Sequence, residues 1–209
     1  MFGALTVGAQ FLPLFDAAGY EVATLTAVLL TLLGLPHLLQ RPARWWGDEQ
    51  PWLCWLRACL PLTAWLFVAM AVSGLNALRV QNCDLPGGLG LMLVLAGGAI
   101  PLVGATAVVA RHVASGRRRW WVAGGMVAAA AAGTLGYLAT QPAIVAYNGY
   151  AGYIAASLYD ESLAPITGHL WFRAGTLAQA VTLVAAVAVV RRSRLGDLAM
   201  LGVGLAISG

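Results

Sequence analysis

The 209-residue chain contains no lysine and little charge of either sign. Its twelve basic residues are all arginine, and only 10% of its residues are charged, against about 25% in soluble domains. The arginines occur in short groups between apolar segments and share no basic face, so we expect no nucleic-acid partner. With 60% hydrophobic residues and a mean hydropathy of +0.79, the composition instead predicts an integral membrane protein in contact with a lipid bilayer.

Recognised catalytic and metal-binding motifs are also missing. The sequence has no His-Glu-x-x-His, no Gly-x-Ser-x-Gly and no phosphate-binding glycine loop. Cys54, Cys59 and Cys83 fit no zinc or haem spacing. Within this chain we therefore expect no catalytic residue, no metal site, no cofactor and no structural disulfide.

Long apolar runs are what the sequence has in abundance. Five of them could cross about 30 Å of hydrocarbon as helices, near residues 20–39, 60–79, 89–110, 120–139 and 171–190. A sixth starts at about residue 197 and stops early, which indicates a fragment of a longer polypeptide or an interfacial segment. Since the alternating pattern of barrel strands is missing, residues 1–209 are predicted to form one all-α, polytopic transmembrane helix bundle. Residues 43–57 are predicted to lie on the membrane surface as a short helix.

The distribution of arginine predicts the orientation. Ten arginines follow the first, third and fifth spans, whereas only Arg79 and Arg173 fall on the opposite side. The positive-inside rule places the ten in the cytoplasm. We therefore expect the N-terminus, residues 80–88 and a long loop at 140–170 to lie outside.

Most of the remaining polar residues lie on the predicted outer side. An ion pair is expected between Arg79 and Glu21 or Asp84. A second is expected between Arg173 and an acid of the long loop, Asp160 or Glu161. These outer polar residues are predicted to form one cluster. The cluster is either a latch that holds loops onto the helix ends or a pocket for a substrate, an ion or a partner domain. Its members are Asp16, Glu21, Arg79, Asn82, Asp84, Tyr147, Asn148, Tyr153, Tyr159, Asp160, Glu161, His169 and Arg173.

Two local patterns in the long loop leave alternatives open. Asp160 and Glu161 could join His169 in a loose cation site, but no recognised spacing supports it, and capping or pinning of the loop is favoured. The tyrosines at 147, 150 and 153 would share one face if residues 144–159 form an interfacial helix. If the segment is extended, its interleaved glycines allow close turns.

Small residues recur at every fourth position of the fourth span, at Gly124, Ala128, Ala132 and Gly136. Such a face lets another helix approach closely, and an internal seam is the favoured interpretation, with a homodimer interface as the alternative. In the third span, Gly97, Gly98 and Pro101 predict a kink, or a broken helix that lines an ion site.

Three segments together resemble a known family: FDAAGYE, NALRVQNCD and QPAIVAYNGYAGYIAASLYDE. The family is the multipass membrane region at the N-terminus of bacterial proteins that end in a peptidase-MA-like, zinc-peptidase-type domain. Its third segment usually has proline and phenylalanine where this chain has Gly149 and Tyr150. The resemblance implies a bacterial inner membrane and a following domain on the outer side, whose zinc ligands are not among these residues.

The favoured functional hypothesis is a non-catalytic membrane module whose outer loops anchor or orient an extracytoplasmic domain, either fused or separate. One alternative is a small-molecule or ion transporter in which Glu21, Arg79 and Arg173 line the path. Another is the membrane anchor of a zinc peptidase whose catalytic domain lies beyond this chain.

Overall fold

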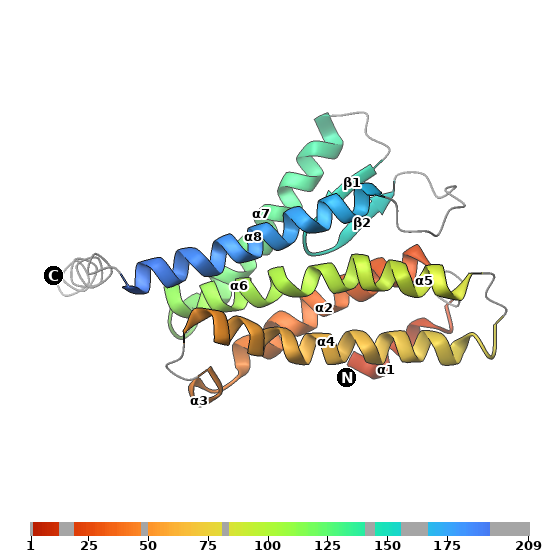
Figure 1. The fold of residues 1–209 in the computed structure, drawn as a ribbon, viewed down its shortest axis with the longest axis horizontal. Coiled ribbons are helices and arrows are strands. Elements are labelled where there is room, and N and C mark those ends of the chain that lie inside the picture. The colour runs from red at the N-terminus through yellow and green to blue at the C-terminus, as the bar shows by residue number, and fades with distance from the viewer. Residues whose placement is uncertain are drawn as a thin grey trace.

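In a computed structural model the protein is a bundle of helices with one hairpin inserted into it (Figure 1). The structure describes residues 2–12, 19–46, 50–80, 84–140, 145–155 and 167–192. Five helical segments are long and apolar enough to cross a membrane, which confirms the predicted helix bundle. They are α2 (Tyr20–Gln40), α4 (Pro51–Asn76), the segment Leu85–Val113, α7 (Arg118–Thr140) and α8 (Thr167–Arg192).

The second span begins earlier than the sequence pattern predicts. Helix α4 starts at Pro51 and continues through Pro61 without a break. A proline at the first helical position loses no hydrogen bond, so Pro51 starts the helix. The predicted surface helix at 43–57 is therefore wrong, because Ala43–Trp46 form the short helix α3 and residues 51–57 belong to α4.

The third span changes helix type midway along its length. Helix α5 (Leu85–Leu91) passes into the π-helical turn η1 (Met92–Ala96), the 3-10 turn η2 (Gly97–Ala99) and then α6 (Ile100–Val113). Gly97 and Gly98 tolerate the altered backbone. Pro101 lies in the first turn of α6, where the absence of its N–H costs least. The regular α-helix is thus interrupted where a kink was predicted, and the ion-site alternative stays a prediction.

Helix α6 is the centre of the bundle. It packs against α2, α4, α7 and α8, and most of its residues are buried. Helix α1 (Phe2–Ala9), which lies beside α4, is a short helix that the apolar pattern did not reveal. Helix α7 differs from the other spans because only 6% of its most apolar 18-residue stretch is buried inside the protein. Figure 1 shows α7 diverging from the bundle.

An antiparallel hairpin connects α7 to the segment before α8. Strand β1 (Val145–Asn148) pairs with β2 (Gly152–Ala155), and Asn148 lies opposite Gly152. Gly152 has a φ of +93°, a conformation that side chains other than glycine rarely adopt. The extended alternative for the tyrosine repeat is therefore correct over residues 145–155, and the helical one is wrong.

Candidate functional site

The turn of the hairpin lies among the helices, not beyond their ends. Tyr150 is only 5% exposed, and its hydroxyl lies 2.7 Å from Thr106 Oγ1 on α6. Its carbonyl accepts a hydrogen bond of 3.2 Å from Thr31 Oγ1 on α2. Both threonines lie well inside their spans. Irregular backbone at such a depth is stable only where protein or enclosed water satisfies its polar groups.

Asn148 fixes the turn on the side of α7. Its Oδ1 accepts hydrogen bonds from the backbone N–H groups of Tyr150 (2.9 Å) and Ala151 (3.0 Å). Its Nδ2 donates to Thr134 Oγ1 (2.9 Å) and to the carbonyl of Ala130 (3.2 Å) on α7. This pattern uses both donors and both lone pairs of the amide, so Asn148 closes the turn and ties it to a helix at once.

Arg173 on α8 fixes the turn from the opposite side. The side chain is 7% exposed, and its Nη1 donates to the carbonyl of Gly149 at 2.8 Å. Its Nη2 donates to the carbonyl of Leu95, which belongs to the π-helical turn η1. A Cβ at Gly98 would overlap this side chain, with Nε only 2.7 Å away, so glycine is what leaves room for the arginine. Arg173 thus clamps α8, the hairpin and the irregular part of the third span together.

The hydrogen-bond acceptors of Arg173 within the described residues are backbone carbonyls, and its guanidinium also lies 5.3 Å from the centroid of the Phe172 ring. Its Nε is buried and has no hydrogen-bond partner in this part of the chain. A guanidinium keeps its charge, and two carbonyl dipoles stabilise that charge without neutralising it. The acids predicted to pair with Arg173, Asp160 and Glu161, lie outside the described residues, and their pairing stays a prediction.

Aromatic contacts join the first strand to the start of α8. The Tyr147 ring stacks on Phe172 with centroids 4.6 Å apart, and it meets His169 edge-on at 5.9 Å. Burial raises the pKa of Tyr147 above its ordinary value. Tyr147 is therefore a neutral phenol at physiological pH, which suits a side chain that packs against a helix.

The hairpin lies beside α7, and a groove lies on each side of this helix. One groove, of about 810 Å³, lies between α7 and α8, with Gly133 and Gly175 on its walls and Leu102 beneath. A smaller one, of about 260 Å³, lies between α2 and α7. Thr134 and Asn148 line both grooves, but Asn148 already uses its hydrogen-bonding groups within the protein.

Arg79 lies in a different environment from Arg173. It is exposed, its Nη2 donates to the carbonyl of Gln10 at 2.7 Å, and its Nε donates to Asn76 Oδ1 at 2.9 Å. The predicted pairs with Glu21 or Asp84 do not form among the described residues, because the unpredicted helix α1 brings Gln10 to the arginine. Asp84 instead caps α5, where it accepts the N–H of Gly87 at 2.9 Å.

The structure therefore divides the predicted polar cluster. It brings together Tyr147, Asn148, His169 and Arg173, and it places Arg79 and Asp84 at the ends of other helices. Glu21 lies half-buried in the first turn of α2. Outside the described residues lie Asp16, Asn82, Tyr159, Asp160, Glu161, the side chain of Tyr153 and the predicted partial span from about residue 197.

Sequence reasoning missed Thr31 and Thr106, which receive the hairpin. Each hydroxyl also bonds a carbonyl of its own helix, Ala27 at 3.1 Å and Leu102 at 2.8 Å. A threonine in an apolar helix usually makes only that local bond, so its presence does not reveal a tertiary partner. The role of Leu95 was also hidden, because it contributes a backbone carbonyl.

The predicted internal seam on α7 is wrong. Gly124, Ala128, Ala132 and Gly136 are all exposed, and a Cβ at either glycine would meet no atom within 4 Å. The one buried residue of α7 is Ala123. The hairpin occupies the space beside α7, so the small-residue face of α7 points away from the bundle. The homodimer alternative stays a prediction.

No family model, curated protein or solved structure matches the chain. The resemblance to the membrane region of peptidase-MA-like proteins therefore stays a prediction, and the functional argument depends on geometry.

Proposed function

We propose that the chain is a non-catalytic membrane module that anchors or orients an extracytoplasmic domain or subunit through residues 156–166. The observation that carries this proposal is the fixation of both flanks of that segment. The hairpin before it and the first turns of α8 after it are tied to each other through Arg173 and through the stacking of Tyr147 on Phe172. Binding segments held by rigid elements are the usual arrangement for recognition.

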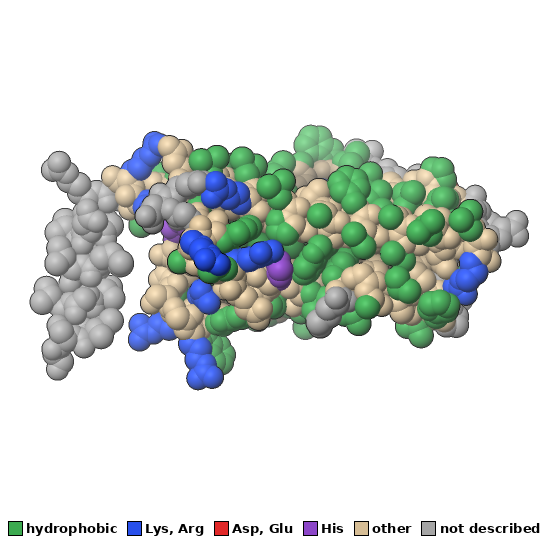
Figure 2. All heavy atoms as spheres, turned by 90° about the horizontal axis from the view of Figure 1, so that it is seen from below, with side chains coloured by type: hydrophobic (Ala, Val, Ile, Leu, Met, Phe, Trp, Pro, Cys, Tyr) green, Lys and Arg blue, Asp and Glu red, His purple; other side chains and the backbone are tan. Residues whose placement is uncertain are grey.

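The sequence of this segment supports a docking role. It reads ASLYDESLAPI, so Tyr159, Asp160 and Glu161 occur together between two fixed ends. The contacts between the arginine-rich helix ends are consistent with an extracytoplasmic side at the opposite end of the bundle. Arg111 Nη1 donates to the carbonyl of Arg41 at 3.0 Å, and Arg191 lines a pocket with Pro51, so the basic helix ends meet at the other end of the molecule. Figure 2 shows most basic side chains gathered at one end of an apolar face.

The described contacts favour this module over a transporter. A transport path lined by Arg79 and Arg173 would need them on one route, but Arg79 bonds Gln10 and Asn76, whereas Arg173 contacts η1 and the hairpin. In a broken-helix transporter, carbonyls of the irregular backbone coordinate the ion. Here the carbonyl of Leu95 is already bound to a guanidinium, which would repel a cation.

The test places a photo-crosslinking amino acid at position 158 or 163 in intact cells, with position 116 in an arginine-rich loop as the control. The proposal predicts a discrete protein adduct from positions 158 and 163 that external protease digests, and no adduct of that mass from position 116. The double variant Asp160→Asn, Glu161→Gln should reduce the adduct several-fold. Adducts of equal mass and yield at all three positions, or none at 158 and 163, would contradict the proposal.

A further inference from the structure

Helix α1 covers only one half of the seam between α2 and α4. Its eight residues span about 12 Å, less than half of the 30 Å hydrocarbon thickness. It begins where Phe2 stacks on Trp65, near the middle of α4, with ring centroids 5.0 Å apart. It ends at Ala9, and Oε1 of the next residue, Gln10, accepts a hydrogen bond of 3.0 Å from Asn76 at the end of α4. The other half of the seam has no helix over it among the described residues.

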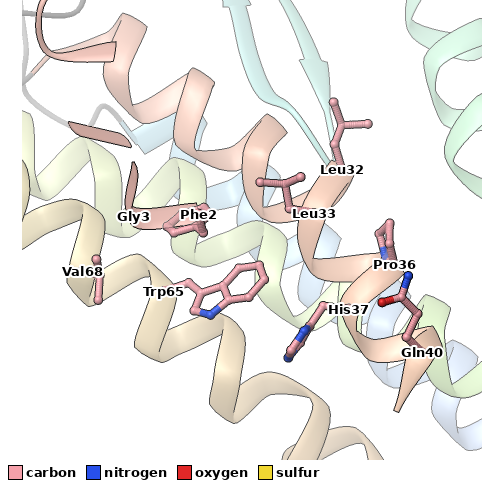
Figure 3. A pocket seen from close by; sticks show the side chains of 9 residues that line it. All are labelled: Phe2, Gly3, Leu32, Leu33, Pro36, His37, Gln40, Trp65 and Val68. Atoms are coloured by element: carbon pink, nitrogen blue, oxygen red, sulfur yellow. The ribbon is translucent and has the colours of Figure 1, made fainter. Parts of the chain in front are cut away.

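The uncovered half is hollowed into a pocket of about 620 Å³ (Figure 3). Its walls are apolar near the start of α1, where Phe2, Leu33 and Val68 surround it. The pocket follows α2 from Leu32 to Gln40, a length of roughly 12 Å. Its polar side chains, His37 and Gln40, lie only at the end remote from α1 (Figure 3). Such a polarity gradient matches an acyl chain with its head group at the arginine-rich end.

Positive charge lies next to the polar end of the pocket. Arg41 follows Gln40, and its Nη2 donates to His37 Nε2 at 2.8 Å. Its Nε is buried and has no acceptor within the described residues. Arg44, three positions further on, is exposed and adds a second positive charge at this end. A phosphate oxygen is the acceptor that an arginine binds best.

We infer that an anionic phospholipid of the leaflet at the arginine-rich end binds in this pocket. One acyl chain lies against Leu33, Trp65 and Val68 and completes the seam that α1 leaves open. Its phosphate accepts hydrogen bonds from Arg41 at the membrane surface. The net negative charge of the head group favours it over zwitterionic lipids, because each arginine near a surface attracts anionic lipid.

The experiment purifies the full chain in mild detergent from membranes of phosphatidylglycerol and phosphatidylcholine and counts retained lipids by native mass spectrometry. Two pairs of variants distinguish binding of the lipid head group from binding of its acyl chain. Arg41→Gln is compared with Arg44→Gln, which removes the same charge at an exposed position. Gly3→Leu fills the pocket at the start of α1, and Gly8→Leu adds the same bulk to α1 where a Cβ would meet no atom within 4 Å.

The inference predicts one retained phosphatidylglycerol in preference to phosphatidylcholine. Arg41→Gln should lower its retention about tenfold or more, because it removes both a positive charge and the direct donors to the phosphate, and Gly3→Leu should abolish it. Arg44→Gln removes only a surface charge and should lower retention by no more than about fivefold, and Gly8→Leu should retain the lipid at least half as well as the wild type. If Gly3→Leu does not fold, Val68→Trp at the partly exposed wall serves the same purpose. Equal retention of the two lipids, or equal losses within both pairs, would overturn the inference and indicate annular lipid only.

Discussion

Arg79 and Arg173 are the two arginines that the sequence sets apart from the rest, and they differ sharply at the scale of the residue. Arg79 is exposed at a helix end, whereas Arg173 is buried and bridges two backbone carbonyls. Removing a buried partner leaves those carbonyls without a hydrogen bond, which is more costly than losing an exposed contact. The two arginines therefore form a natural matched pair for mutation.

We expect Arg173→Ala to lower the free energy of unfolding by about 2–4 kcal/mol, because two buried carbonyls lose a charged donor. Arg173→Lys should recover less than half of the loss, since an ammonium lacks the planar fork that reaches both carbonyls. Arg79→Ala should cost less than about 1 kcal/mol. Thermal unfolding in detergent measures all three, and equal effects of Arg79→Ala and Arg173→Ala would contradict the clamp.

The contact between Tyr150 and Thr106 predicts that removing one hydroxyl costs more stability than removing the other. Tyr150→Phe removes one hydroxyl but leaves the Thr106 hydroxyl bonded to the Leu102 carbonyl, so the expected cost is at most about 1 kcal/mol. Thr106→Val leaves the buried phenol without its partner and should cost about 1–3 kcal/mol. The unfolding midpoints of the two variants give the order. A larger loss for Tyr150→Phe would show that the phenol has another acceptor.

At the scale of the element, the irregular third span depends on which of two adjacent glycines is changed. Alanine generally favours helix over glycine by about 1 kcal/mol. At Gly97 the added Cβ would lie 3.2 Å from the end of the Leu66 side chain, which can adjust. At Gly98 it would displace Arg173. Gly98→Ala should therefore destabilise the protein, and Gly97→Ala should change its stability by less than about 1 kcal/mol.

A double-mutant cycle checks this explanation of Gly98. In the Arg173→Ala background the overlap disappears, so Gly98→Ala should become neutral or stabilising. Additive effects of the two substitutions would mean that Gly98 is needed for its own backbone conformation. Chemical or thermal unfolding of the four proteins in one detergent provides the cycle.

In helix α7, the cost of enlarging a small residue should depend on whether that residue faces the bundle or faces away from it. Ala123 is 1% exposed and Ala128 is exposed, although both are alanines of the same helix. Ala123→Leu should cost more than about 1 kcal/mol by overpacking, and Ala128→Leu should change monomer stability by less than about 0.5 kcal/mol. A fall in oligomer mass for Ala128→Leu in light scattering would instead support the homodimer alternative.

The sequence predicted the spans well because each long apolar run encodes its own helix through length and hydropathy. It also predicted the irregularity of the third span, because Gly97, Gly98 and Pro101 act locally. It did not predict that residues 148–151 enter the bundle. That depth depends on distant partners, a hydroxyl at Thr106 and a carbonyl at Leu95, and nothing near the hairpin in the sequence encodes them. The seam on α7 was misassigned for the same reason, since the hairpin fills its expected place.

At the scale of the whole molecule, the arginine-rich helix ends and the segment presented by the hairpin lie at opposite ends of the bundle in the proposed arrangement. Single cysteines at Ser115 and Thr140, introduced after the native cysteines are replaced, test the orientation. The positive-inside rule predicts that a membrane-impermeant maleimide labels position 140 in intact cells and labels position 115 only after lysis. The reverse pattern would invert the topology and remove the proposed extracytoplasmic docking role.

The central claim is that the hairpin turn is a fixed part of the bundle and that Arg173 holds it there. Hydrogen–deuterium exchange of the full chain in lipid nanodiscs measures this most directly. The account predicts that the amides of Tyr150 and Ala151 exchange as slowly as those of α6, and that Arg173→Ala accelerates them while α6 stays protected. Exchange in the wild type as fast as in the exposed turn at 116–117 would contradict the claim.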